Sequence, residues 1–99
     1  MCEFKVINKG NENQIAEDIV ILGYSDLNEL ILKDVLGIAT KIDAALIRSV
    51  NTLNQTLIIQ QDPLIQDFLN LLDKKNANTL KKEDIETFQE KLENLKSSI

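Results

Sequence analysis

The sequence predicts an α+β protein, in which a small antiparallel β-barrel-like domain over residues 1–61 is followed by a helical hairpin over residues 62–99. Two observations indicate this fold class. Short alternating or β-branched runs separated by turn residues fill the first part of the chain, and the hydrophobic period changes to that of a helix after Asp62-Pro63. A chain of 99 residues can bury a modest core without a disulfide.

Six short segments are predicted to be strands because their residues alternate in polarity or are β-branched. They cover residues 4–7, 19–22, 30–33, 38–42, 46–50 and 56–59. Turn-forming residues lie between them at 8–11, 23–26, 34–37 and 51–54, and Gly37 suits a positive φ in a tight connection. Residues 38–50 also contain helix-tolerant alanines, so a helix there is the alternative to the favoured strands.

A first helix is expected after Asp62, which suits the N-cap, because Pro63 fits the first helical turn. Lys74 and Lys75 favour the negative end of the helix dipole, and the stretch 76–78 contains residues that end a helix. The apolar stripe of this helix comprises Leu64, Ile65, Phe68, Leu69, Leu71 and Leu72.

A second helix is expected to begin near Thr79 or a residue or two later, with Glu83, Asp84 and Glu86 in its first turns. Its apolar residues follow the a/d spacing of a helix-packing seam: Ile85, Phe88, Leu92, Leu95 and Ile99. This seam must bury against the first helix, the β domain or a second subunit, and packing within the chain is the favoured interpretation.

Composition excludes several classes of function. Sixteen acidic and eleven basic residues give a net charge of −5, and with four aromatic residues and Arg48 as the sole arginine, nucleic-acid binding is not expected. A local patch of Lys5, Lys9, Lys33 and Lys41 keeps it open as an alternative. The absence of histidine excludes a Ser-His-Asp triad, and three separated glycines make no phosphate loop, so we expect no enzyme.

One cysteine permits no internal disulfide, which predicts a reducing, cytoplasmic compartment. No apolar run approaches the length that spans a bilayer, and the N-terminus lacks a secretory leader, so no membrane association is expected.

Cys2 is the main candidate for a metal ligand, because removal of Met1 would place a free amine and a thiol on the same residue. The backbone amide of Glu3 is the next donor, and this set suits square-planar Ni(II) or Cu(II). A tetrahedral zinc site cannot be assembled within one subunit, whereas two N-termini together could supply four donors. The alternative is that Cys2 is an ordinary small hydrophobic residue.

A hard-cation site is the competing prediction, because carboxylate oxygens are the ligands that Ca(II) prefers. Acidic residues near neighbouring β turns could form such a pocket: Glu17, Asp18, Asp26, Glu29 and Asp34. The stretch 73–84 has the length of an EF-hand loop, but it contains Lys75 and Lys81 and no glycine at the bend. We therefore interpret it as the connection of the helical hairpin.

Four stretches of residues 1–60 resemble the CooT family in order and approximate spacing: Met1-Cys2-Glu3, the stretch 16–20 (AEDIV), the stretch 32–37 (LKDVLG), and 47–59 with Leu53-Asn54. These small bacterial and archaeal proteins include some catalogued as predicted RNA-binding proteins, and the named member is a nickel protein associated with carbon monoxide dehydrogenase maturation. The resemblance implies a β-barrel-like homodimer that binds Ni(II) where two Cys2 residues meet, and a client metalloenzyme. The favoured function is a non-catalytic metal-binding accessory protein, and the alternative is an interaction module without metal.

Overall fold

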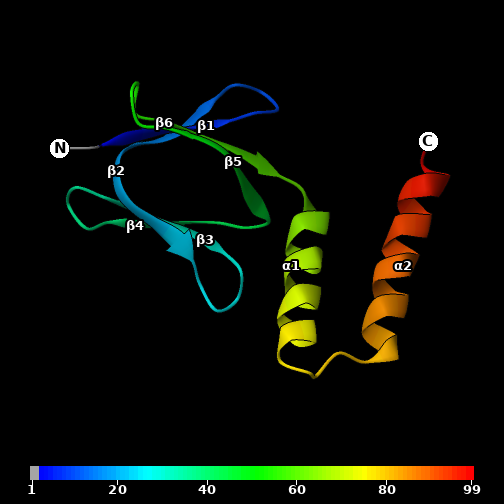
Figure 1. Cartoon of the computed structure of the whole chain (residues 1–99). Helices are drawn as coiled ribbons and strands as arrows, with labels where there is room; N and C mark the ends of the chain where they lie inside the picture. Colours follow the sequence, from blue (N-terminus) through cyan, green and yellow to red (C-terminus); the bar gives the residue numbers. More distant parts are fainter. Residues whose placement is uncertain (1–2) are drawn as a thin grey trace. The chain divides into compact units, whose positions relative to one another are not determined.

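The computed structural model describes residues 3–99, in which six strands precede two helices (Figure 1). The strands are β1 (Phe4–Asn8), β2 (Gln14–Tyr24), β3 (Leu30–Asp34), β4 (Ala39–Ile42), β5 (Ala45–Asn51) and β6 (Thr56–Gln61). The helices are α1 (Pro63–Asn76) and α2 (Lys82–Ser97). The predicted α+β class is confirmed, and residues 38–50 form two strands rather than a helix.

The strands form one sheet in the order β4-β3-β2-β1-β6-β5. All neighbouring pairs are antiparallel except β1 and β6, which run parallel with Lys5 opposite Thr56 and Asn8 opposite Ile59. The sheet curls, but β4 and β5 remain separate edges, so it is an open sheet and only loosely barrel-like. The Tyr24 hydroxyl donates a hydrogen bond to the Ala45 carbonyl at 2.7 Å, which ties the end of β2 to the start of β5.

The core lies on one face of this sheet, and every strand contributes to it. Alternate residues point inward, as the strand period requires, so Leu30 and Leu32 of β3 are fully buried, as are Leu57 and Ile59 of β6. The buried apolar residues are Val6, Ile19, Leu30, Leu32, Ile42, Ala45, Leu57 and Ile59. All of them lie in strands, so this sheet has a core of its own.

β2 is longer than the predicted strand at 19–22, because a bulge breaks the polarity alternation by which its first residues would have been recognised. Between Phe4 and Val6 of β1, the partner residue on β2 moves from Ile19 to Ala16, so β2 carries an extra residue. Asp18 at this point has φ 57°, which re-aims the strand. Polarity alternation over 14–18 is therefore broken in the sequence, although the segment is a strand.

The β3–β4 connection is a turn organised by Asp34. One carboxylate oxygen of Asp34 accepts hydrogen bonds from the amides of Leu36 and Ile38, both at 2.9 Å. Gly37 has φ 82°, as predicted, and its amide donates to the Asp34 carbonyl.

The chain divides into two compact units, of which the first ends at Gln66 and the second is Asp67–Ile99. We call the first the β unit and the second the helical hairpin. The first turn of α1 belongs to the β unit, because the Gln66 side chain donates to the Leu27 carbonyl at 3.2 Å and the Asp62 amide donates to the Ala44 carbonyl at 2.9 Å. This division therefore differs by one helical turn from a border at residues 61 and 62.

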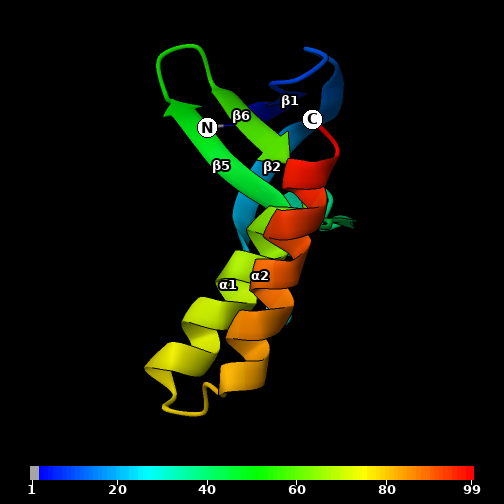
Figure 2. The same ribbon diagram turned by 90° about the vertical axis from the view of Figure 1, so that its right-hand side faces the viewer.

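The ends of the two helices follow local chemistry. The Asp62 carboxylate accepts the Leu64 amide at 2.9 Å, which caps α1 as expected. At the other end, Asn78 has φ 58°, and the amides of Asn78 and Thr79 donate to the carbonyls of Lys75 and Lys74. These bonds form a Schellman motif that ends α1. Both figures show α1 and α2 side by side beyond this turn (Figure 2).

α2 begins at Lys82, and its first turn is capped by Asp84, whose carboxylate accepts the Lys81 amide at 2.9 Å. No helix among the described residues is long and apolar enough to cross a membrane.

Candidate functional site

Cys2, the principal predicted ligand, lies outside the described residues, whereas Glu3 and the strand that follows it are described. Glu3 is half-buried, and Phe4 packs against the core of the β unit. β1 occupies an interior position of the sheet between β2 and β6. The described part of the chain therefore enters the fold at a strand that is hydrogen-bonded on both sides.

The β5–β6 turn lies beside this entry point. The Lys5 amide donates to the Gln55 carbonyl at 2.9 Å, and Gln55 adopts φ 54° at the end of the turn. Leu53 in the same turn is 97% exposed. An apolar side chain thus stands in solvent on the turn next to the start of β1, although the sequence alone indicates only a loop there.

The five acidic residues of the alternative Ca(II) site lie in two places. Glu17, Asp18 and Asp34 are near the β2 bulge, where the Val35 amide donates to the Asp18 carbonyl and Ile19 pairs with Asp34. Asp26 and Glu29 are at the opposite end of the β2–β3 hairpin, beyond the pair of Tyr24 and Leu30. The two places are separated by the length of β3, roughly 13 Å for four strand residues.

The Asp34 carboxylate already accepts two hydrogen bonds from backbone amides of its own turn. The Glu17 carboxylate accepts a hydrogen bond from the Gln14 side-chain amide at 3.5 Å. Among residues 3–99, no three Asp, Glu or Cys side chains are grouped so that they could hold a metal ion together. The Ca(II) site stays a prediction, to be tested alongside nickel.

A polar cleft of the β unit was not predicted from the sequence. It has a volume of about 510 Å³ and lies where the β1–β2 loop approaches β4 and the end of β6. The Asn8 side chain donates to Gln61, which donates to the Asp43 carbonyl, both at 3.2 Å. Its lining comprises Asn8, Asn11, Asn13, Ile15, Thr40, Lys41, Ile42, Asp43 and Gln61. In the sequence these asparagines indicate only a turn, so nothing there predicted that they line a cleft together with residues of β4 and β6.

Two ion pairs join the helices of the hairpin. Lys74 contacts Asp84 and Lys91 contacts Asp67, each at 2.8 Å between nitrogen and oxygen. A hydrogen bond from Lys74, together with the bond from the Lys81 amide, lowers the pKa of the Asp84 carboxyl below its ordinary value of 3.8. Asp84 thus holds the two helices together, which fits a hairpin connection rather than an EF-hand loop.

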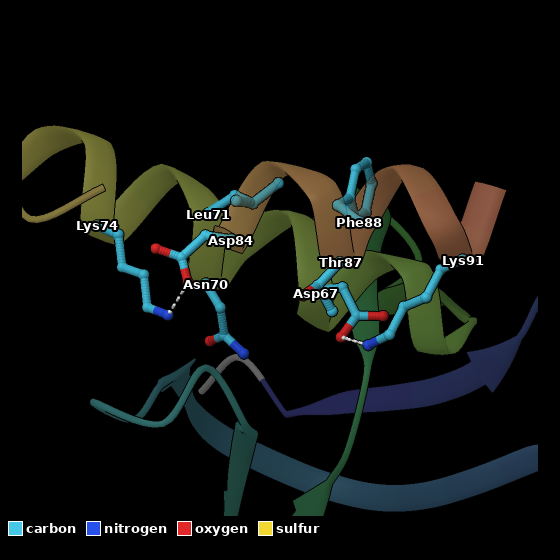
Figure 3. A pocket seen from close by; sticks show the side chains of 8 residues that line it. All are labelled: Asp67, Asn70, Leu71, Lys74, Asp84, Thr87, Phe88 and Lys91. Carbon is cyan, nitrogen blue, oxygen red and sulfur yellow. Dashed lines mark hydrogen bonds and ion pairs between the residues drawn. The ribbon is translucent and has the colours of Figure 1, made fainter. Parts of the chain in front are cut away.

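A shallow cavity of about 170 Å³ lies along these ion pairs (Figure 3). The Phe88 ring points away from the two ion pairs, and it lies beside Phe68 with ring centroids 6.4 Å apart. The cavity is therefore bordered by apolar side chains, Leu71 and Phe88, as well as by the charged residues of the two ion pairs.

These features define a small α+β protein whose first strand is locked into the middle of an open sheet and whose N-terminal segment is the candidate site. The model of the CO dehydrogenase accessory protein CooT matches residues 1–60. The chain therefore belongs to the CooT family, a family of CO dehydrogenase accessory proteins, as its sequence motifs indicated. The helical hairpin lies beyond the matched region. No curated protein matches the chain.

Proposed function

We propose that this protein is a non-catalytic accessory protein that binds Ni(II) through Cys2, with the N-termini of two subunits sharing one metal ion. The observation that carries the proposal is the family match, which begins at residue 1 and so includes Met1-Cys2-Glu3. The client is an enzyme of the class named in the family description, a CO dehydrogenase.

The donor chemistry at the N-terminus fits nickel. After removal of Met1, each chain supplies a thiolate, an amine and the backbone amide of Glu3, and Ni(II) accepts such nitrogen and sulfur donors in a square plane. With no histidine in the chain, softer donors come from Cys2 alone. Bound nickel is cargo for the client, and the protein's own residues hold it and keep it from other ligands.

The end of the β unit at which β1 begins is suited to contact with another protein chain. β1 is hydrogen-bonded on both sides, so its own residues lose little conformational freedom when two copies meet at this end of the β unit. The exposed Leu53 on the adjacent turn offers apolar contact area at the same end of the β unit.

A titration of tag-free protein with Ni(II), after mass spectrometry has verified the loss of Met1, tests the proposal. We expect charge-transfer absorption that saturates at one nickel per two chains and is lost in Cys2→Ser. Asp18→Asn is the control, since it changes an acidic residue of the alternative site and should leave nickel binding unchanged. Absence of the signal with a free amine would overturn the proposal, and Ca(II) binding that Asp18→Asn weakens would support the acidic site instead.

A further inference from the structure

The two free edges of the open sheet differ in how well they could accept another strand. The edge at β5 is irregular, because its register shifts between Ile47 and Ser49 and the Ala45 carbonyl already accepts the Tyr24 hydroxyl. The edge at β4 is regular, since its residues 39–42 pair with β3 without any shift. Of the two edges, β4 therefore offers the more continuous template.

The register of the β3–β4 hairpin determines which backbone groups of β4 are unpaired. The Asp34 amide donates to the Ile38 carbonyl at 3.1 Å, so these two residues form a hydrogen-bonded pair. Such pairs alternate with non-hydrogen-bonded pairs along an antiparallel ladder. Thr40 is therefore bonded to β3, whereas Ala39 and Lys41 direct their amides and carbonyls away from it.

The polar cleft of about 510 Å³ borders this edge, because residues 40–43 line it. Its other lining residues include Asn11, Asn13 and Ile15. Side-chain amides both donate and accept hydrogen bonds, which suits them to a peptide backbone, and Ile15 offers apolar contact at an exposed fraction of 36%. The cleft thus combines an unpaired strand edge with groups that can bind a further strand.

Two opposite charges in the cleft indicate the chemistry of its occupant. Lys41 and Asp43 are exposed, and neither takes part in the two ion pairs found within residues 3–99. Being two positions apart in an extended stretch, they lie on the same side of the chain. A lysine on an edge strand disfavours pairing with another copy of that edge, whereas each charge favours an opposite charge directly across from it.

We propose that β4 accepts an extended segment of another protein as an additional antiparallel strand. The segment carries a basic residue opposite Asp43 and, two positions later, an acidic residue opposite Lys41. Apolar residues between and after these face the side of Ile15 and Ile42. Hydrogen bonds to the backbone of Ala39 and Lys41 supply the affinity, and the order of the two charges sets the strand direction, because a parallel segment needs the reverse order. The pairing needs no metal, so it does not depend on nickel binding.

The test uses the blocked peptide acetyl-Thr-Lys-Val-Glu-Val-Thr-amide, whose glutamate stands opposite Lys41 when its lysine stands opposite Asp43. It is titrated into isotope-labelled full-length protein with a chelator present, and binding is followed by the NMR amide resonances. We expect the resonances of Ala39 and Lys41 to shift and to saturate at millimolar peptide.

Two methylated peptides test the backbone pairing. Methylation of the glutamate backbone nitrogen removes the donor to the Lys41 carbonyl, so it should weaken binding by about tenfold or more. Methylation of the following valine nitrogen is the matched control, because that amide points away from β4 and binding should be unchanged.

Charge reversal tests the side-chain pairing. Lys41→Glu should raise the dissociation constant by about fivefold, and a peptide with lysine in place of its glutamate should restore the affinity. Lys5→Glu makes the same change at an exposed lysine of β1 that does not line the cleft, and it should bind as wild type does.

Three results would overturn the inference: no shift at millimolar peptide, shifts confined to strands other than β4, or equal binding of the two methylated peptides. Unchanged binding by Lys41→Glu would contradict the assigned charges. Shifts of the β4 amides that follow protein concentration without any peptide would also overturn it, because they would assign the edge to a second copy of the chain. All of these results leave the nickel titration unaffected.

Discussion

The β unit and the helical hairpin differ in where their apolar residues lie. The strands bury eight apolar residues, six of them completely, whereas no residue of α1 or α2 is buried. The β unit is therefore held by hydrophobic burial, and the hairpin by an aromatic pair, two ion pairs and helix capping. The difference teaches that the family domain has a hydrophobic core of its own, whereas the appended helices are joined mainly by contacts between their side chains.

The largest expected effect lies in the core of the β unit. Leu32→Ala removes a fully buried side chain and should lower the free energy of unfolding by about 2–5 kcal/mol, because a cavity is left behind. Urea unfolding followed by the fluorescence of Tyr24, the only tyrosine, reports on this unit alone. Leu53→Ala, at a side chain 97% exposed, is the control and should shift stability by less than about 0.5 kcal/mol.

A core shared between the two regions would contradict this picture. In that case Leu32→Ala would lower the urea midpoint by the same amount whether unfolding is followed by Tyr24 fluorescence or by the helical signal at 222 nm. The two regions would then share one core.

A smaller effect is expected where the curled sheet is tied together. Tyr24→Phe removes the hydrogen bond to the Ala45 carbonyl and should cost about 0.5–1.5 kcal/mol. Burial raises the pKa of the Tyr24 hydroxyl above its ordinary value of 10.0. The contribution of the Tyr24 hydroxyl to the free energy of unfolding is therefore fully present below pH 10, and it is lost as the pH rises through the higher pKa of the folded state.

Unfolding of wild type and Tyr24→Phe followed by circular dichroism at 218 nm measures both effects. The variant should lose the additional decline above pH 10. A variant as stable as wild type at pH 7, with the same alkaline decline, would show that the hydroxyl does not hold β2 to β5.

The smallest effect concerns the hairpin at low pH. Because the pKa of Asp84 is lowered in the fold, its contribution is present above the ordinary pKa of 3.8 and is lost as the pH falls through the lower folded value. Thermal unfolding at 222 nm should therefore weaken below about pH 4 in wild type. Asp84→Asn should be slightly less stable at neutral pH and less sensitive to acid, and an identical acid response in both proteins would exclude this role for Asp84.

Much of the fold was predictable because short sequence patterns determine its strands, turns and helix ends. The strands at 30–33 and 56–59 are short aliphatic runs bounded by turn residues, Gly37 and Asp34 mark a turn, and Asp62-Pro63 marks the start of α1. The parallel pairing of β1 with β6 was not predictable, since it joins residues about fifty positions apart with no local signal. The extension of β2 was missed because the bulge at Asp18 breaks the alternation on which a strand is recognised.

The candidate site was predictable only in its chemistry. Residue types at the N-terminus indicate soft-metal ligation, but Cys2 lies outside the described residues, and the metal stays a prediction. The separation of Asp26 and Glu29 from Asp18 and Asp34 follows from the strands predicted at 19–22 and 30–33, because each strand holds the acidic residues that flank it at opposite ends. The cleft around Asn8 and Gln61 was not predictable, because it brings together residues far apart in the sequence that no local pattern connects.

The interior position of β1 also governs the order of events during synthesis. β1 emerges first, yet one of its two neighbours is β6, which ends at Gln61. At about 5–20 residues per second, the ribosome needs several seconds to deliver that strand. Throughout this interval one side of β1 lacks its partner, so the sheet cannot be completed until the last strand of the β unit arrives.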